Sequence, residues 1–122
     1  MKKFGLIGFP LGHSFSRNYF NSRFLQESIT DCSYSNFEIP DIHLLTEVLK
    51  DPELQGLNVT IPYKKDVIPF LHTVDSVVRH TGACNCIRIQ NQQVHGYNTD
   101  VTGFEKSLME KWTPGDHRAL IL

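Results

Sequence analysis

The fold is decided by one short stretch, Leu57-Asn58-Val59-Thr60-Ile61-Pro62-Tyr63-Lys64. The apolar and β-branched character of its first five residues predicts a short buried strand. Because side chains alternate across a strand, its three apolar residues should pack on one face, with Asn58 and Thr60 on the other. Pro62 cannot donate to a sheet ladder and should end the strand. Lys64 then follows near the strand's carboxyl end.

This arrangement brings an amide, a hydroxyl and an ammonium group to the carboxyl edge of a sheet. Open α/β folds bind small molecules at that edge. The strand alone is equally compatible with a structural interpretation, in which the polar strand end and Lys64 are simply exposed to solvent. Both interpretations, the binding site and the solvated strand end, stay open at this point. We expect the neighbouring Lys65 to be solvated.

Composition indicates an ordinary globular protein. The chain has 122 residues, 40% hydrophobic and 20% charged, which suits one domain. The formal net charge is −1, with both signs interspersed, which argues against a nucleic-acid surface or a polybasic membrane anchor. No apolar run approaches the roughly 18 residues of a membrane span, and the N-terminus does not resemble a signal peptide. We therefore expect a cytoplasmic protein.

The three cysteines predict free thiols. An odd number without secretory features does not indicate a disulfide framework. Cys84-Asn85-Cys86, with His80 nearby, has neither redox nor zinc-knuckle spacing. We expect Cys84 and Cys86 to be buried strand thiols that behave as small hydrophobic groups, and we expect no metal.

The first strand, residues 4–8, is apolar enough to be buried on both faces. It leads into the loop Gly8-Phe9-Pro10-Leu11-Gly12-His13-Ser14-Phe15-Ser16 and a helix to about residue 27, with Tyr19, Phe20, Phe24 and Leu25 as an apolar stripe. Ser14 or Ser16 is a candidate N-cap. The helix start would alternatively accept a carboxylate or phosphate. The loop spacing matches neither a dinucleotide fingerprint nor a P-loop.

Further elements follow in an alternating order. We predict a strand over 33–39, a helix from 40–41 to about 49, the strand 57–61, and a helix over about 74–80 closed by Gly82. Residues 83–89 and 93–97 predict an antiparallel hairpin joined by Gln90-Asn91-Gln92, and a helix over about 101–111 comes next. The predicted fold class is therefore α/β: a mostly parallel sheet flanked by helices, with an antiparallel hairpin.

The last residues indicate a second domain. After Thr113-Pro114-Gly115, the run from Arg118 to Leu122 predicts a new strand without a partner. We expect residues 1–113 to form one domain and residues 114–122 to be a linker and first strand of another.

Four motifs in order now resemble one family. They are Gly8 to Ser16, Asn58-Val59-Thr60-Ile61-Pro62-Tyr63-Lys64, Gly82-Ala83-Cys84-Asn85, and Gly96-Tyr97-Asn98-Thr99-Asp100. Together they resemble the substrate-binding domain of shikimate dehydrogenase over residues 4–104. The resemblance implies that the fold is that of this N-terminal domain and that residues 119–122 begin a Rossmann-type NADP domain. The pattern departs after Ser16, where Arg17 and Phe20 replace the family's frequent proline and histidine, while Asn21 is kept.

The resemblance also implies roles for individual residues. Ser14 and Ser16 would bind the shikimate carboxylate, and Lys64 with Asp100 would form the catalytic pair. The remaining substrate contacts would come from Asn58, Thr60 and Asn85. The implied reaction is the reversible, NADPH-dependent reduction of 3-dehydroshikimate to shikimate in chorismate and aromatic amino acid biosynthesis. In that reaction Lys64 would stabilise charge on the carbonyl oxygen and transfer a proton. How this proton role divides between Lys64 and Asp100 stays open.

Other interpretations remain open. A lysine at this position, Lys64 or Lys65, also suits Schiff-base chemistry in an aldolase or dehydratase. The chain alone also suits a stand-alone shikimate- or quinate-binding module without catalysis, or a quinate/shikimate dehydrogenase-like protein. The sequence leaves undecided the preference for NADP over NAD and a homodimer of the full-length enzyme.

Overall fold

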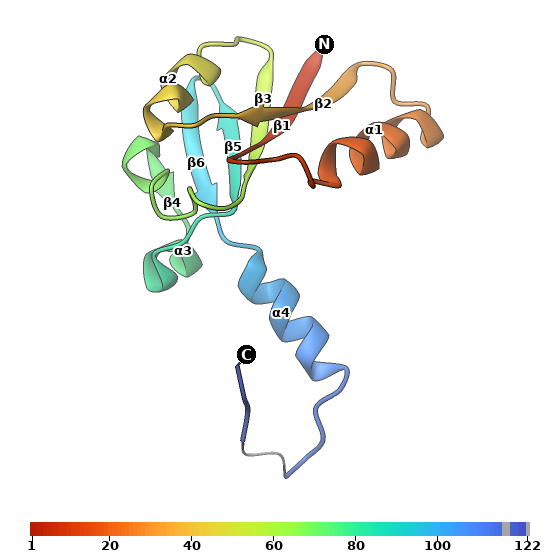
Figure 1. Ribbon diagram of the computed structural model, residues 1–122, viewed down its shortest axis with the longest axis vertical. Helices are drawn as coiled ribbons and strands as arrows, with labels where there is room; N and C mark the ends of the chain where they lie inside the picture. The colour runs from red at the N-terminus through yellow and green to blue at the C-terminus, as the bar shows by residue number, and fades with distance from the viewer. Residues whose placement is uncertain (116–117, 122) are drawn as a thin grey trace.

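A six-stranded sheet forms the centre of the computed structural model, which describes residues 1–115 and 118–121 (Figure 1). The strands are β1 (Lys2–Gly8), β2 (Cys32–Glu38), β3 (Leu54–Val59), β4 (Thr73–Val74), β5 (Cys86–Gln90) and β6 (Gln93–Tyr97). They lie in the order β2-β1-β3-β5-β6-β4. β1 pairs in parallel with β2 and β3, β4 pairs in parallel with β6, and β5 is antiparallel to both β3 and β6. Within this sheet only β5 therefore runs against the others, which confirms the predicted fold class.

The β5–β6 hairpin has a tighter turn than predicted. Gln90 pairs with Gln93, which leaves a two-residue loop of Asn91 and Gln92. Both loop residues are left-handed, with φ of 50° and 62°. Two-residue hairpins favour this backbone because its twist matches that of the strands.

Strand β4 was not predicted, because two residues are too few to show a periodic pattern.

The sheet is buried on both faces along β1, as the sequence predicts. Ile7 belongs to the larger core, whereas its neighbour Leu6 belongs to a second cluster with Leu11 and Tyr34. The larger core lies under the short helices η1 (Ile42–Leu44), α2 (Leu45–Val48), η2 (Ile68–Phe70) and α3 (Ser76–Thr81). Its most deeply buried members are Ile7, Leu45, Leu54, Val67, Val78, Cys84 and Ile87.

Helix α1 (Ser16–Gln26) covers the second cluster with only part of its expected stripe. Phe20 and Phe24 pack against the cluster, but Tyr19 is 59% exposed and Leu25 81% exposed. The stripe prediction was wrong for these two residues, because the helix contacts the sheet over a narrow strip. Helix α3 ends at Gly82, whose φ of 65° is the left-handed cap that the sequence predicts.

Three other expectations need correction. Strand β3 ends at Val59, and Ile61 is 74% exposed instead of packed, because the chain turns there and Tyr63 N–H donates to the Thr60 carbonyl. The helix expected from residue 40 is a 3₁₀ turn followed by one α-helical turn. Residues 118–121 are not a strand, and Leu122 lies outside the described residues.

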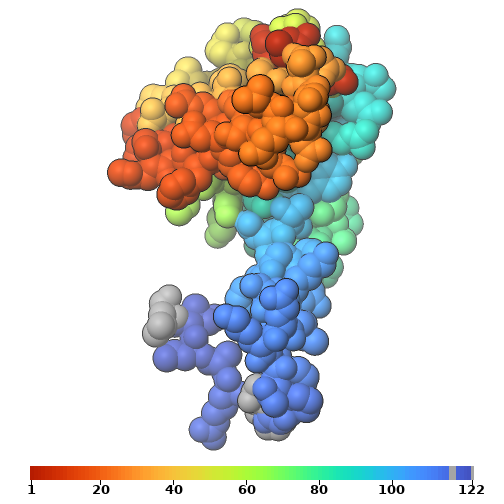
Figure 2. Space-filling model, turned by 90° about the vertical axis from the view of Figure 1, so that its right-hand side faces the viewer, coloured from red at the N-terminus to blue at the C-terminus, as the bar shows by residue number. Residues whose placement is uncertain are grey.

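Helix α4 (Asp100–Met109) leads away from the sheet, as Figures 1 and 2 show. None of its residues is buried. Among the described residues, no helix has the length and apolar character needed to cross a membrane.

Candidate functional site

One edge of the sheet gathers every residue proposed from the sequence. Strands β1, β3 and β6 run in the same direction, so their carboxyl ends meet at this edge, together with the amino end of antiparallel β5. A pocket of about 620 Å³ opens there. Its lining includes all seven predicted site residues: Ser14, Ser16, Asn58, Thr60, Lys64, Asn85 and Asp100. Segments at the ends of four strands, β1, β3, β5 and β6, thus contribute to a single polar site.

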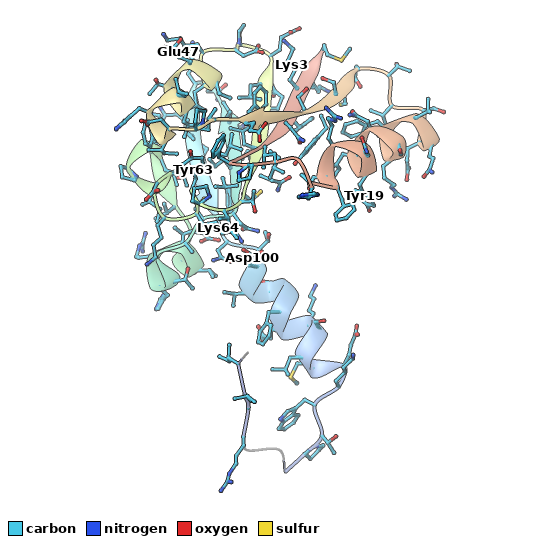
Figure 3. All side chains as sticks on the ribbon, viewed as in Figure 1. Lys3, Tyr19, Glu47, Tyr63, Lys64 and Asp100 are labelled. Carbon is cyan, nitrogen blue, oxygen red and sulfur yellow. The ribbon has the colours of Figure 1, made fainter. Side chains whose placement is uncertain are left out.

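Lys64 and Asp100, which both line this pocket, form an ion pair. The Lys64 Nζ atom lies 2.7 Å from Asp100 Oδ2, and the two side chains point toward one another where α4 begins (Figure 3). Asp100 is the first residue of α4, where the helix dipole favours a negative charge. The side chains are 36% and 52% exposed, so the pair contributes little to stability. The ion pair instead fixes the direction in which the Lys64 ammonium group points.

Asn85 holds the start of α4 against the sheet. Its Nδ2 donates to Thr99 Oγ1 at 2.8 Å and to Asp100 Oδ1 at 3.2 Å, while its Oδ1 accepts from Thr99 N–H at 2.8 Å. Asp100 therefore contacts Lys64 with one oxygen and Asn85 with the other. Asn85 therefore orients Asp100.

Asn98 supports this arrangement from below. It is only 6% exposed, and its Nδ2 donates to Thr81 Oγ1 at 3.2 Å and to the Ala83 carbonyl at 3.0 Å. Its Oδ1 accepts from Val101 N–H at 3.1 Å in the first turn of α4. Nothing local in the sequence indicated the burial of this asparagine or its contacts with residues 81 and 83.

The two serines lie at the other side of the pocket, around the start of α1. Both are half-buried, and Ser14 Oγ accepts a long 3.4 Å hydrogen bond from Ser16 N–H. The N-cap residue of α1 is Phe15, so neither serine occupies the predicted N-cap position, although Ser14 Oγ accepts from the first N–H of the helix. Leu11 N–H donates to Glu38 Oε1 at 2.8 Å and ties the preceding loop to β2. The hydroxyls and the helix start thus face the pocket with hydrogen-bonding capacity left over.

Of the two glycines in this loop, Gly8 serves packing, whereas a Cβ atom on Gly12 would meet open space. A Cβ atom on Gly8 would lie 2.6 Å from Thr60 Cγ2, 2.8 Å from Leu11 Cδ2 and 3.0 Å from the Ile61 carbonyl oxygen. The space beside Gly8 is therefore filled by protein atoms. At Gly8, the backbone is therefore not open to a close approach by a dinucleotide phosphate.

Cys84 and Cys86 flank the site residue Asn85 but have no reactive character. All three carry free thiols; Cys84 is fully buried and Cys86 is half-buried in β5. Cys84 lies before β5, so only Cys86 is a strand residue as predicted. Burial raises the pKa of both thiols, which disfavours the nucleophilic thiolate. Over residues 1–115 and 118–121, no three His, Cys, Asp or Glu side chains come together as a metal site would require.

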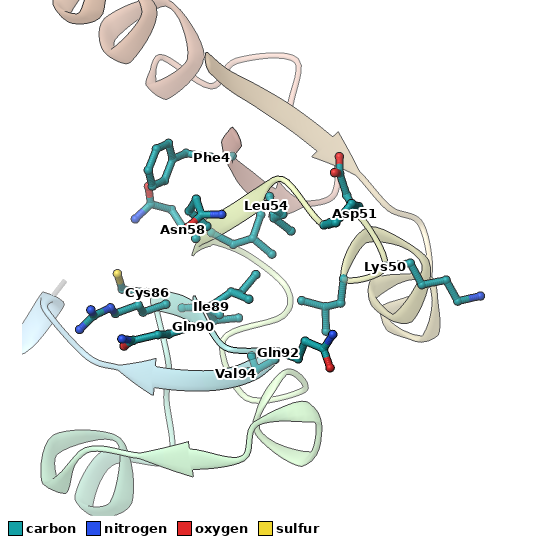
Figure 4. A pocket seen from close by; sticks show the side chains of 18 of the residues that line it. Phe4, Lys50, Asp51, Leu54, Asn58, Cys86, Ile89, Gln90, Gln92 and Val94 are labelled. Atoms are coloured by element: carbon teal, nitrogen blue, oxygen red, sulfur yellow. The ribbon is translucent and has the colours of Figure 1, made fainter. Parts of the chain in front are cut away.

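A second, larger pocket of about 1380 Å³ extends over the sheet toward the β5–β6 turn. Figure 4 shows Phe4 and Asn58 on one side of it and Cys86, Ile89 and Gln90 on the other. It does not include the Lys64–Asp100 pair or either of the two serines. We place the candidate site in the smaller pocket because the charged and polar groups converge there.

These features define a class of protein. Amide, hydroxyl, ammonium and carboxylate groups at the carboxyl ends of parallel strands make an α/β domain that binds a small polar molecule. A family model described as the shikimate dehydrogenase substrate binding domain matches residues 6–87. The chain belongs to this family, as the sequence motifs predict.

Relatives and solved structures agree with this assignment. A shikimate dehydrogenase (NADP(+)) of Caldicellulosiruptor saccharolyticus is 41% identical over 127 aligned positions, which cover 100% of this chain and 45% of the relative. Crystal structures of shikimate dehydrogenase from Aquifex aeolicus (TM-score 0.82, 34% identity) and from Thermus thermophilus in complex with shikimate (TM-score 0.80, 27% identity) have the same fold. They match 91% and 90% of this chain, and in both cases 42% of the solved chain. The chain thus spans less than half the length of these proteins.

Proposed function

We propose that this chain is the substrate-binding domain of an NADP-dependent shikimate dehydrogenase. The reaction is the reversible reduction of 3-dehydroshikimate to shikimate, within aromatic amino acid biosynthesis in the cytoplasm. The observation that carries the proposal is the Lys64–Asp100 pair, at 2.7 Å, on the wall of a pocket that also contains two serines and two asparagines. Residues 1–113 would form this domain, and residues 114–122 would lead into a cofactor domain.

The pocket has two polar regions that suit the two ends of such a substrate. Ser14 and Ser16, beside the start of α1, would bind the carboxylate, because hydroxyls and free N–H groups at a helix start favour an anion. Asn58, Thr60 and Asn85 would bind ring hydroxyls between that region and the Lys64–Asp100 pair. The ring would then lie with its reacting carbon near the ion pair.

Lys64 would handle the proton of the reaction. Reduction of a ketone places negative charge on the carbonyl oxygen, and an ammonium group within hydrogen-bond reach stabilises that charge and donates a proton. Asp100 would fix the direction of the ammonium through Oδ2, while Asn85 holds Oδ1 of the same carboxylate. The oxidation of shikimate would use the same groups in reverse.

NADP is the cofactor that the relatives' names imply for the proposed enzyme. The backbone at Gly8, in the strand-to-helix turn that precedes α1, does not fit its phosphates, because protein atoms crowd that glycine. What this chain contributes is therefore binding of the substrate, its orientation and the proton.

A titration of the 122-residue chain with shikimate tests the proposal. Calorimetry should give saturable binding, and amide NMR shifts should appear at the five residues Ser14, Ser16, Asn58, Asn85 and Asp100. Shifts confined to the larger pocket, around Arg88 and Gln92, would place the ligand elsewhere and contradict the assignment.

The neighbouring lysine provides a matched control. Lys65 is exposed and lies outside the pocket lining, so Lys65→Ala should leave the binding of shikimate unchanged. Borohydride added with 3-dehydroshikimate should leave the mass of the protein unchanged, because the proposed chemistry forms no imine. A covalent adduct on Lys64 would favour Schiff-base chemistry instead.

A further inference from the structure

Tyr34 reaches the candidate site from beneath it, although it is not among the residues that line the smaller pocket. It lies in β2 at the opposite side of β1 from Asn58, and only 4% of it is exposed. Its hydroxyl nevertheless donates to Asn58 Oδ1 at 2.8 Å. Because Tyr34 pairs with Phe4 whereas Asn58 pairs with Leu6, the long phenol side chain extends diagonally beneath β1 to make this contact.

The tyrosine itself is held on several sides. Asn21 of α1 pairs with both of its backbone groups: Nδ2 donates to the Tyr34 carbonyl at 2.8 Å, and Oδ1 accepts from Tyr34 N–H at 3.0 Å. The ring stacks on Phe20 with centroids 4.7 Å apart and an interplanar angle of 19°. A side chain fixed in this way has a single position from which to donate.

The phenol remains a donor over the whole physiological range. Burial raises the pKa of Tyr34 to about 12, although Ser16 partly opposes this effect. The donated proton therefore stays on the tyrosine, and Asn58 Oδ1 stays occupied as an acceptor.

We infer that Tyr34 is a positioning residue that fixes the orientation of the Asn58 amide, so that Asn58 acts on a ligand only as a hydrogen-bond donor. With Oδ1 occupied by the phenol, the two Nδ2 hydrogens remain for the pocket. Asn58 then selects an acceptor oxygen on the ligand and discriminates against a group that can only donate.

This inference rests on the proposed function for the identity of the ligand, but its geometric part does not depend on any ligand. The test variant is Tyr34→Phe, which keeps the ring stacked on Phe20 and removes only the hydroxyl. Tyr19→Phe is the matched control, because Tyr19 lies on the neighbouring helix and is 59% exposed.

The first measurement needs no ligand. The side-chain amide signals of Asn58, identified by their loss in Asn58→Ala, should shift in Tyr34→Phe and stay in place in Tyr19→Phe. Unshifted signals in Tyr34→Phe would overturn the inference whether or not shikimate binds. A general loosening of the fold would shift many backbone amides, which the same spectra would reveal.

The second measurement is a double-mutant cycle on shikimate affinity. Tyr34→Phe should weaken binding about two- to tenfold, the usual range for one neutral hydrogen bond. The variant carrying both Tyr34→Phe and Asn58→Ala should bind no more weakly than Asn58→Ala alone, because Tyr34 acts through Asn58. If the double variant instead loses shikimate affinity by the product of the two single-variant factors, the inference is wrong. If the unmodified chain does not bind shikimate while the Asn58 signals shift as expected, the proposed function fails and the positioning role stands.

Discussion

Replacing Asn98 by alanine should destabilise the domain and disturb the site together. The Asn98 side chain makes three hydrogen bonds, two to the segment around Ala83 and one to the first turn of α4. Thr81 is exposed, so water replaces its lost partner at little cost. The losses that count are the hydrogen bonds to Ala83 and Val101. A buried hydrogen bond and a helix cap contribute about 1 kcal/mol each. The expected loss of unfolding free energy is therefore about 2 kcal/mol.

Urea unfolding followed by circular dichroism measures this loss. For a slope of about 2 kcal/mol/M, the midpoint should fall by about 1 M. Asn18→Ala is the control, because Asn18 lies exposed on α1 and should change stability by no more than about 0.5 kcal/mol. In folded Asn98→Ala protein, NMR signals of Asn85 and Asp100 should also shift. A loss below about 0.5 kcal/mol, with those signals unmoved, would refute the argument that Asn98 anchors α4.

Three further predictions concern the site and its pH dependence. In the longer enzyme that we propose, Lys64→Ala should slow turnover by several orders of magnitude while barely changing shikimate affinity; near-normal turnover in a steady-state assay would remove Lys64 from the mechanism. Ser14→Ala and Ser16→Ala should each weaken shikimate binding by about 1–2 kcal/mol in calorimetry, as expected for a hydrogen bond to a charged group, and unchanged affinity in both would place the carboxylate elsewhere. Because the pKa of Tyr34 is raised to about 12 in the folded state, its contribution to stability is complete below about pH 10 and is lost as the pH rises toward 12. Urea midpoints should therefore fall less over this range in Tyr34→Phe than in the unmodified chain, and equal falls would contradict the shift.

Much of the fold followed from local pattern. The apolar run of β1, the alternation in β2 and the strand before Pro62 each carry their own signal, because burial on one or two faces selects side chains position by position. Gly82 at the end of α3 was equally predictable, since its left-handed backbone favours glycine. Strand β4 and the exposure of Ile61 were not, because a two-residue pairing and a change of chain direction leave no periodic trace.

The sequence by itself determined the family, the order of the longer strands and helices, and the seven residues proposed for the site, because these depend on residue types at fixed spacing. Only the tertiary structure decided which side chains support them. Tyr34 and Asn58 lie 24 positions apart and meet beneath β1, and Asn98 joins the segment at Ala83 to α4. In the sequence, a tyrosine in a strand indicates a core position, and an asparagine before a helix indicates a cap. Their further partners come from other parts of the chain, so only strand pairing and packing could bring those partners within hydrogen-bond distance.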